Sequence, residues 1–189
     1  MITNKKELKE YLKADFQAFG MQHYELGKWT YGENAWLFSY VKTLRHLEYY
    51  MNIKQTLWNK LFKNIYLLRH RRNCIKYGIN LSPNVFGKGV SLVHPGFRRI
   101  GAYMKIGDNC TLLPMVLIGK KSPTCDISDC TIGDNCYVGT GAIVMEPIKI
   151  GNNVTIAAGS VVTKDIPDNA IVAGNPAKII KIKSCSAEG

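Results

Sequence analysis

One histidine lies in the part of the chain whose residue pattern could build a rigid site. The sequence has four histidines, and His94 alone lies beyond residue 79, where a six-residue repeat begins. An imidazole on the outside of a rigid coil can accept a proton from a hydroxyl group at neutral pH and return it to a leaving group. His94 is therefore the candidate general base. The alternative is a histidine held at a turn for structural reasons.

The histidines and cysteines lack the spacing of a metal site. A catalytic zinc on such a scaffold needs several histidine ligands from neighbouring coils, and the repeat region supplies one. Cys125, Cys130 and Cys136 are five and six positions apart rather than arranged as a Cys-x-x-Cys pair. We therefore expect no metal cofactor.

The elements that would position His94 come from a repeat of period six. Aliphatic residues recur every sixth position in two blocks, and the next residue is often glycine. The aliphatic positions are Ile100, Ile106, Leu112, Ile118, Ile132, Val138, Val144, Ile150, Ile156 and Val162. A triangular coil with three short flat faces has this period, whereas a helix or a lone strand does not. The pattern predicts a parallel β-helix over residues 79–189, with glycine or asparagine at corners that need a positive φ.

The two blocks are out of step by two residues between Ile118 and Ile132. The extra residues predict a polar loop at 120–128 that projects from the coil. Such a loop on a rigid scaffold is a candidate acceptor-binding element or lid. A tolerated surface insertion is the alternative.

Residues 1–78 show helical spacing instead. Asn4 with Glu7 resembles a capping box, and apolar residues follow at helical intervals as far as Phe19, which predicts a helix before Gly20. Two more helices are predicted over 34–51 and 56–76, the last ended by Gly78. We expect a small helical segment stacked on the β-helix.

The net charge of +11 is unevenly distributed. Residues 1–78 hold 14 basic and 6 acidic residues, and the stretch 54–76 holds seven basic residues with no acid among them. This basic helix is either a solvated face or a surface that attracts phosphates or an anionic membrane. No recognition motif accompanies the charge, so we expect no nucleic-acid partner.

The composition favours a cytoplasmic protein. No apolar run approaches the length of a membrane-spanning helix, and the first residues lack the apolar core of a signal peptide. The six cysteines are then expected to be reduced thiols rather than a disulfide framework.

Residues 79–181 resemble the left-handed β-helix, hexapeptide-repeat acyltransferases. The motifs behind this resemblance are Asn80-Leu81-Ser82-Pro83, Gly87-Lys88-Gly89, His94 and the ending Val172-Ala173-Gly174-Asn175-Pro176-Ala177-Lys178. With a helical segment ahead of them, they are similar to the serine acetyltransferase branch and its relatives in polysaccharide gene clusters. The resemblance implies acetyl-CoA as donor, a homotrimer with active sites between prisms, and His94 as catalytic base.

The same resemblance implies where the donor lies. The backbone amide of Gly119 would hold the oxyanion of the tetrahedral intermediate. Lys164 and Lys178 are candidates for the nucleotide phosphates, with solvated lysines as the alternative. A wall of small residues would receive pantetheine, since small residues let a ligand run close to the backbone. That wall comprises Gly139, Gly141, Ala157, Ala158 and Gly159.

Three departures from the serine acetyltransferase pattern bear on the acceptor. Asn80 replaces the aspartate that pairs with the catalytic histidine, Val93 replaces the aspartate before His94, and Ser128-Asp129 align with an Arg-His pair. An amino-acid acceptor needs a cation for its carboxylate and an anion for its ammonium group, whereas a sugar hydroxyl needs neither. We therefore expect an O-acetyltransferase acting on a sugar or polysaccharide precursor, with serine as the alternative acceptor. A non-catalytic scaffold is a third possibility.

The sugar interpretation selects further residues. Asn80 would orient His94 through its side-chain oxygen but could not offset an imidazolium charge, so another acid, such as Asp126 or Glu146 of an adjacent subunit, would be needed. The side chains expected to contact the acceptor are Phe97, Tyr103, Asp126 and Asp129.

Overall fold

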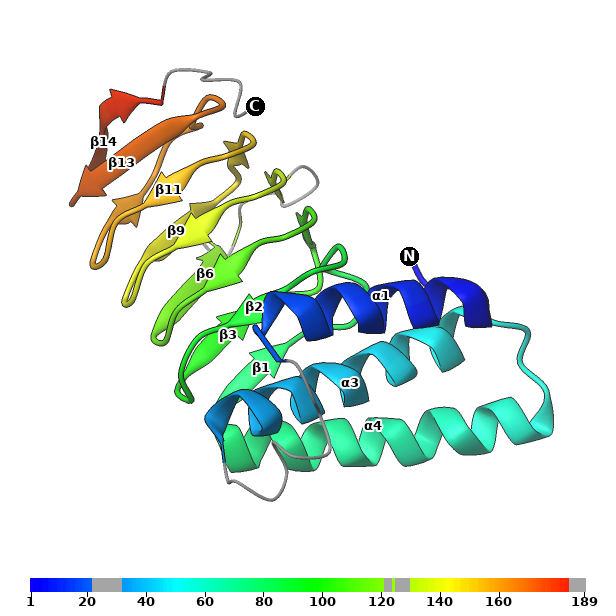
Figure 1. Ribbon diagram of the computed structural model, residues 1–189. Helices are drawn as coiled ribbons and strands as arrows, with labels where there is room; N and C mark the ends of the chain where they lie inside the picture. The colour runs from blue at the N-terminus through cyan, green and yellow to red at the C-terminus, as the bar shows by residue number, and fades with distance from the viewer. Residues whose placement is uncertain (22–31, 121–123, 125–129, 184–189) are drawn as a thin grey trace, which may run out of the picture.

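Three α-helices among the described residues lie together at one end of the molecule (Figure 1). The computed structural model describes residues 1–21, 32–120, 124 and 130–183. The helices are α1 (Lys5–Ala18), α3 (Glu33–Asn52) and α4 (Leu57–Tyr77). The helices predicted over 34–51 and 56–76 are thus present, each with its ends shifted by one residue. None of the described helices has the length and apolar character needed to cross a bilayer.

The helix ends follow from local chemistry. The Asn4 side chain accepts a hydrogen bond from the Glu7 N–H at 2.9 Å, which satisfies a free donor of the first turn of α1. The Glu7 carboxylate accepts from the N–H of Thr3 at 2.6 Å, and this bond together with the backbone N–H of Asn4 lowers the pKa of Glu7. Thr56 caps the start of α4, and Gly78, with φ of +66°, ends it.

The strands form three sheets that run along the faces of a prism (Figure 1). They are β1 (Ile79–Leu81), β2 (Ser91–Leu92), β3 (Arg98–Ile100), β4 (Met104–Ile106), β5 (Thr111–Leu112), β6 (Val116–Lys120), β7 (Cys130–Ile132), β8 (Tyr137–Val138), β9 (Ile143–Glu146), β10 (Lys149–Ile150), β11 (Thr155–Ile156), β12 (Val161–Val162), β13 (Ala170–Gly174) and β14 (Ala177–Ile182). The sheet orders are β1-β3-β6-β9-β12, β10-β7-β4 and β14-β13-β11-β8-β5-β2. All pairs are parallel except β13 with β14, which is antiparallel.

The six-residue repeat forms the interior of the prism. All ten aliphatic positions of the repeat are at most 4% exposed, and register pairs such as Ile106 with Ile132 and Leu112 with Val138 stack them between successive coils. The burial of this continuous column is the main favourable term that holds the coils together. The predicted fold class, a left-handed parallel β-helix with an N-terminal helical segment, is confirmed.

Asparagine and glycine both occupy corners with a positive φ, as expected, Gly141 and Gly159 among them. Asn109, Asn135 and Asn153 carry the positive φ at three corners, each near +57°. The glycine after the aliphatic residue has another role: at Gly107, an added Cβ would lie 2.1 Å from Oδ1 of Asp134 on the next coil. Glycine is therefore needed there for close stacking of coils rather than for backbone conformation.

A buried ion cluster fixes the helices on the first coil. Arg45 Nε donates to Asp15 Oδ2 at 2.8 Å and Nη1 to Glu48 Oε2 at 3.0 Å, and all three residues are at most 1% exposed. Nη1 also donates to the carbonyl of Phe86, and Asp15 Oδ1 accepts from the Val90 N–H, both at 3.0 Å. Burial opposes the charge of Arg45, but the Glu48 and Asp15 carboxylates outweigh it, so the pKa of the guanidinium is raised. Removal of one member would leave buried charge unpaired.

Helix side chains also satisfy the outer edge of β1. The Tyr40 hydroxyl donates to the Ile79 carbonyl at 3.2 Å and accepts from the Leu81 N–H at 3.1 Å. Nε2 of His70 lies 3.1 Å from the Leu81 carbonyl. Backbone groups that no strand pairs therefore find partners on α3 and α4.

The projecting loop expected at 120–128 falls between β6, which ends at Lys120, and β7, which begins at Cys130. Almost all of it lies outside the described residues. Asp126, Ser128 and Asp129 also lie outside them.

Candidate active site

His94 lies at the corner between β2 and β3. Its φ of +57° places it in the left-handed region, which a side chain of this size rarely adopts and which is often found at functional sites. The side chain is 63% exposed in the single chain. The structure thus places the imidazole on the outside of the coil, where it can meet a ligand.

A buried arginine fixes the turn that carries His94. Arg98 in β3 is 0% exposed, and its guanidinium donates to the carbonyl oxygens of Val93, His94 (2.8 Å) and Gly96 (3.1 Å), and to that of Leu112 (3.1 and 3.2 Å). Every side-chain hydrogen bond of Arg98 within the described residues reaches a backbone carbonyl, and burial lowers its pKa to about 10. The guanidinium therefore holds the strained turn in one conformation.

The partner of His94 comes from the helical segment. Glu33 is the first residue of α3, and its Oε1 lies 2.6 Å from Nδ1 of His94. With the Nδ1–H donating to the carboxylate, Nε2 keeps its lone pair as proton acceptor. Glu33 is not among the site residues that the sequence predicts, because an acidic residue in the first turn of a helix is also the ordinary partner of the helix dipole.

A cavity of about 480 Å³ opens where α3 and α4 approach the His94 turn, with neither His94 nor Glu33 in its lining. Its lining comprises Trp36, Lys76, Tyr77, Pro95 and Gly96. The Lys76 ammonium lies 5.1 Å from the centre of the Tyr77 ring. Aromatic surface together with one cation, in a volume of this size, is typical of a small-molecule site.

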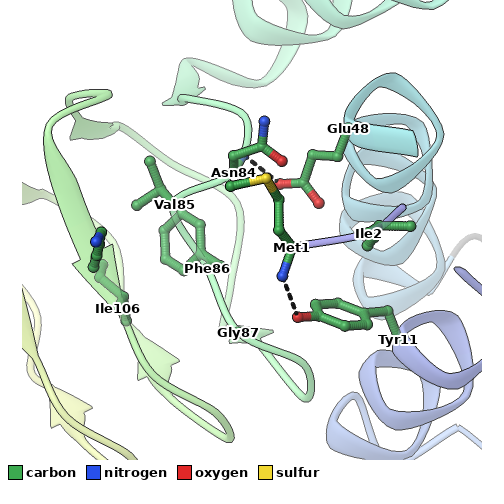
Figure 2. Close-up of a pocket in the computed structure, with 10 residues that line it drawn as sticks. Met1, Ile2, Tyr11, Glu48, Asn84, Val85, Phe86, Gly87 and Ile106 are labelled. Atoms are coloured by element: carbon green, nitrogen blue, oxygen red, sulfur yellow. Dashed lines mark hydrogen bonds between the residues drawn. The ribbon is translucent and has the colours of Figure 1, made fainter. Parts of the chain in front are cut away.

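A second cavity, of about 260 Å³, lies between the helices and the first coil (Figure 2). Figure 2 shows the Glu48 carboxylate turned toward Asn84, whose N–H donates to Oε1 at 2.8 Å, while Oε2 already accepts from Arg45. No residue of the His94 turn lines this cavity. Its acid is thus engaged in holding the fold, and the cavity is not a candidate for the chemistry.

Three other predicted site residues lie on the strands and turns around His94. Asn80 lies exposed in β1, in register with Arg99, and the contacts described for His94 involve Glu33 rather than Asn80. The role of Asn80 in orienting His94 stays a prediction. Phe97 is 44% exposed on the His94 turn, whereas Tyr103 packs against the core.

The small residues predicted to receive pantetheine form two stacked turns on neighbouring coils. They are Gly139 and Gly141 between β8 and β9, and Ala157, Ala158 and Gly159 between β11 and β12. The Gly139 N–H donates to the Ile156 carbonyl at 2.9 Å, and the Gly159 N–H donates to the Thr140 carbonyl at 2.8 Å. The structure therefore stacks all five residues, with Ala158 and Gly159 exposed and Gly139 buried against the next coil.

The remaining donor candidates are more dispersed. Gly119 lies in β6, in register with Met145, and an added Cβ there would have no neighbour within 4 Å. Lys164 follows β12, and Lys178 lies in β14; both are exposed. Glu146, the acid considered as a substitute partner, ends β9.

Comparison with known proteins gives a consistent result. The family model for bacterial transferase hexapeptide repeats (six repeats) matches residues 129–164. Serine acetyltransferase 4 of Arabidopsis thaliana is 34% identical over 148 residues, which cover 75% of this chain and 42% of that protein. The serine acetyltransferase of Buchnera aphidicola is 32% identical over 143 residues, which cover 75% and 52%. The chain thus spans about half the length of these curated relatives.

Solved structures agree in fold. A serine acetyltransferase from Brucella abortus strain S19 is 25% identical, with a TM-score of 0.73 over 96% of this chain and 72% of that one. A serine acetyltransferase structure in complex with coenzyme A from the same strain has a TM-score of 0.71 at 24% identity, over 96% and 71%.

These relatives correct one expectation. A sugar or polysaccharide precursor was expected as the main acceptor, and the proteins that this chain resembles are serine acetyltransferases instead. The expectation relied on missing charges at Asn80, Val93 and 128–129, and it overlooked the carboxylate that α3 brings to His94. The repeat model, the curated relatives and the coil geometry identify the chain as a hexapeptide-repeat protein of the serine acetyltransferase-like kind.

Proposed function

We propose that the chain transfers an acetyl group from acetyl-CoA to the hydroxyl of L-serine, with His94 as general base. The observation that carries this proposal is the hydrogen bond between Nδ1 of His94 and Oε1 of Glu33, at 2.6 Å. It gives the imidazole an oriented, basic Nε2 on a turn that Arg98 keeps rigid. The relatives named above support serine as the acceptor.

The reaction follows from this arrangement. Nε2 of His94 removes the proton of the serine hydroxyl as the oxygen attacks the thioester carbon. The Glu33 carboxylate stabilises the imidazolium that forms, a task for which Asn80 has no charge. When the tetrahedral intermediate collapses, the C–S bond breaks and the thiolate takes the proton back from Nε2. The products are O-acetylserine and free coenzyme A, and no acyl-enzyme forms.

The cavity next to the His94 turn supplies one charge that serine requires, and Glu33 supplies the other. Lys76 in its lining offers a cation for the carboxylate of the substrate. Oε2 of Glu33, the oxygen that does not face Nδ1, has the charge that the substrate ammonium group needs. Both residues come from the helical segment, away from the repeat motifs on which the acceptor prediction depended.

Acetyl-CoA would lie along the two stacked turns of small residues. Pantetheine needs a surface with few side chains, and Gly139 and Ala158 stack so closely that a Cβ on Gly139 would lie 2.6 Å from the Ala158 nitrogen. Lys164 and Lys178 are the proposed phosphate contacts, and the Gly119 amide the proposed oxyanion donor. The similar fold of a protein solved with coenzyme A supports this placement.

The proposed assembly is a homotrimer in the cytoplasm. The side chains of His94 and Glu33 are 63% and 43% exposed in one chain, so a neighbouring prism would be needed to exclude water from the reaction. The four cysteines among the described residues, Cys74, Cys110, Cys130 and Cys136, are free thiols, as a reducing compartment requires.

The test is release of coenzyme A thiol from acetyl-CoA with and without L-serine. We expect release that depends on serine, that falls with His94→Ala and Glu33→Gln, and that is unchanged with Glu10→Gln on the exposed side of α1. No serine-dependent release from the parent protein, or undiminished release from His94→Ala, would overturn the proposal.

A further inference from the structure

Helix α4 exposes a stripe of large apolar side chains. Most of its members lie three, four or seven residues apart, which places them on one face of the helix. They are Leu57, Trp58, Leu61, Ile65, Leu68 and Ile75, with exposed fractions between 47% and 86%. Soluble chains seldom expose so many large apolar side chains side by side without a partner for them.

The opposite face of α4 carries the fold. His70 is buried against β1, and Cys74 and Tyr77 pack against the core. Figure 1 shows α3 between α4 and α1, so that α4 lies at one side of the helical layer. The apolar stripe is therefore additional to what packing of this helix requires.

Cations flank the stripe on both sides. On a helical projection Lys60 and Arg71 lie along one margin and Arg69 lies along the other, with Arg72 within the stripe, and all four are exposed. α4 contains no acidic residue. A hollow of about 600 Å³ on this face is lined in part by Ile65, Leu68, Arg69 and Arg72, so that apolar and cationic groups meet in one concave site.

We propose that this face of α4 binds the headgroup region of a bilayer that contains anionic phospholipids. Apolar residues including tryptophan would enter the boundary between headgroups and acyl chains, and the flanking arginines and lysine would contact lipid phosphates. This binding does not rest on the proposed acetyl transfer, although Lys76 lines both the hollow and the cavity next to the His94 turn.

The charge and the apolar stripe of this face disfavour two other partners, a second copy of the chain and a nucleic acid. A second copy of α4 would bring cations against cations with no acid to separate them, which disfavours self-association through this face. A nucleic acid would use the cations but would leave the stripe of Trp58, Leu61 and Leu68 exposed to water. An anionic bilayer uses both features at once.

The experiment is co-sedimentation of the full chain with vesicles, either of phosphatidylcholine alone or of phosphatidylcholine and phosphatidylglycerol in equal parts, at low and high salt. One variant reverses two charges along a margin of the stripe and the one within it (Lys60→Glu, Arg71→Glu, Arg72→Glu). A second makes the stripe polar (Trp58→Ser, Leu61→Ser, Leu68→Ser). The matched control reverses three exposed lysines of α1 (Lys5→Glu, Lys6→Glu, Lys9→Glu), with the same change in net charge.

We expect the parent and the α1 control to bind the phosphatidylglycerol vesicles at low salt, with each α4 variant binding about tenfold more weakly. Neither the parent nor the α1 control should bind vesicles of phosphatidylcholine alone. Tryptophan fluorescence should shift to the blue on binding, and Trp58→Phe should remove the shift. We expect each variant to fold, because every substituted side chain is exposed. Circular dichroism is the check.

Three results would overturn the proposal. The first is no binding of the parent to anionic vesicles at low salt. The second is an equal loss of binding to anionic vesicles in the α1 control and in the charge variant, which would mean that net charge alone determines the binding. The third is a stripe variant that lowers the oligomeric mass in light scattering while the parent fails to bind vesicles, which would assign the face to a second copy.

Discussion

Glu33 and His94 are 61 residues apart in the chain, and Oε1 of the first lies 2.6 Å from Nδ1 of the second. One belongs to the first turn of a helix and the other to a corner of the β-helix. The distance between them depends on how α3 docks on the first coil, which the cluster of Arg45, Asp15 and Glu48 determines. The proposed catalytic pair thus forms only when two different kinds of structure are assembled.

Glu33→Gln should lower kcat for serine about tenfold to a hundredfold, because the amide can still accept the Nδ1–H bond but cannot stabilise an imidazolium. Glu33→Asp should recover part of the loss, since it restores the charge at a shorter reach. Steady-state kinetics with L-serine measures both. Equal activity of Glu33→Gln and the parent would show that the carboxylate has no part in the proton transfer.

Arg98→Met should destabilise the fold by about 2–4 kcal/mol, because it strands carbonyl oxygens that the buried guanidinium now satisfies. Freed from those bonds, the His94 turn should also lose its conformation, so kcat should fall in the molecules that remain folded. Urea unfolding and kinetics test the two effects. Arg99→Met, at the exposed neighbour, is the matched control and should change neither.

Lys76→Met should raise the KM for L-serine while leaving the KM for L-serine methyl ester nearly unchanged. The ester has no carboxylate for the Lys76 ammonium to hold, so the variant removes an interaction that only the acid form makes. An equal rise for both acceptors would point to a packing effect and would contradict this role for Lys76.

Gly119→Ala and Gly133→Ala should separate ligand binding from stability. An added Cβ at Gly119 has no neighbour within 4 Å, so the variant should unfold like the parent but bind acetyl-CoA less well. At Gly133, the Cβ would lie 2.5 Å from Asn152 Oδ1 and 2.8 Å from its nitrogen, at a cost of about 1–3 kcal/mol. Thermal unfolding and KM for acetyl-CoA measure the two properties.

The stability of the fold should fall as the pH drops below about 6.5. Burial lowers the pKa of His70 and of His46, so the unfolded chain takes up protons before the folded one does. The stabilisation is complete above the unfolded pKa and is lost as the pH falls through the folded values. Nε2 of His70 faces the Leu81 carbonyl, and Nδ1 is buried with no partner among the described residues, which favours the neutral ring.

Urea unfolding at about pH 7.5 and about pH 5.5 measures this loss. Replacement of His70 with Gln should make the free energy of unfolding less dependent on pH, with His46 responsible for the remainder. A steeper dependence in that variant would contradict the assignment.

Most of the fold could be predicted because its information is local. A six-residue period identifies the buried positions of the prism, and helical periodicity with capping residues identifies α3 and α4 to within one residue at each end. The division of labour between Asn109 and Gly107 could not be predicted, because it depends on the side chain of Asp134 on the next coil. The spacing of residues along one coil does not show which side chains of the next coil they contact.

Site residues could be predicted only where the residue type by itself indicated a role. His94 stood out as a histidine beside the repeat motifs, and the small residues from Gly139 to Gly159 stood out by composition. Glu33 and Arg98 did not, since an acid that starts a helix and an arginine in a turn are ordinary surface residues by pattern. Their roles come from burial and from docking, which no spacing along the chain records.

One sheet is covered at each end of the coil stack. At one end Tyr40 and His70 occupy the backbone groups of β1, and at the other β14 turns back antiparallel and places Lys178 and Lys181 on the outermost strand of its sheet. Parallel coils with open ends would recruit strands of other molecules, as in amyloid growth. Strand addition, which could in principle extend the repeat without limit, is therefore opposed at these two edges.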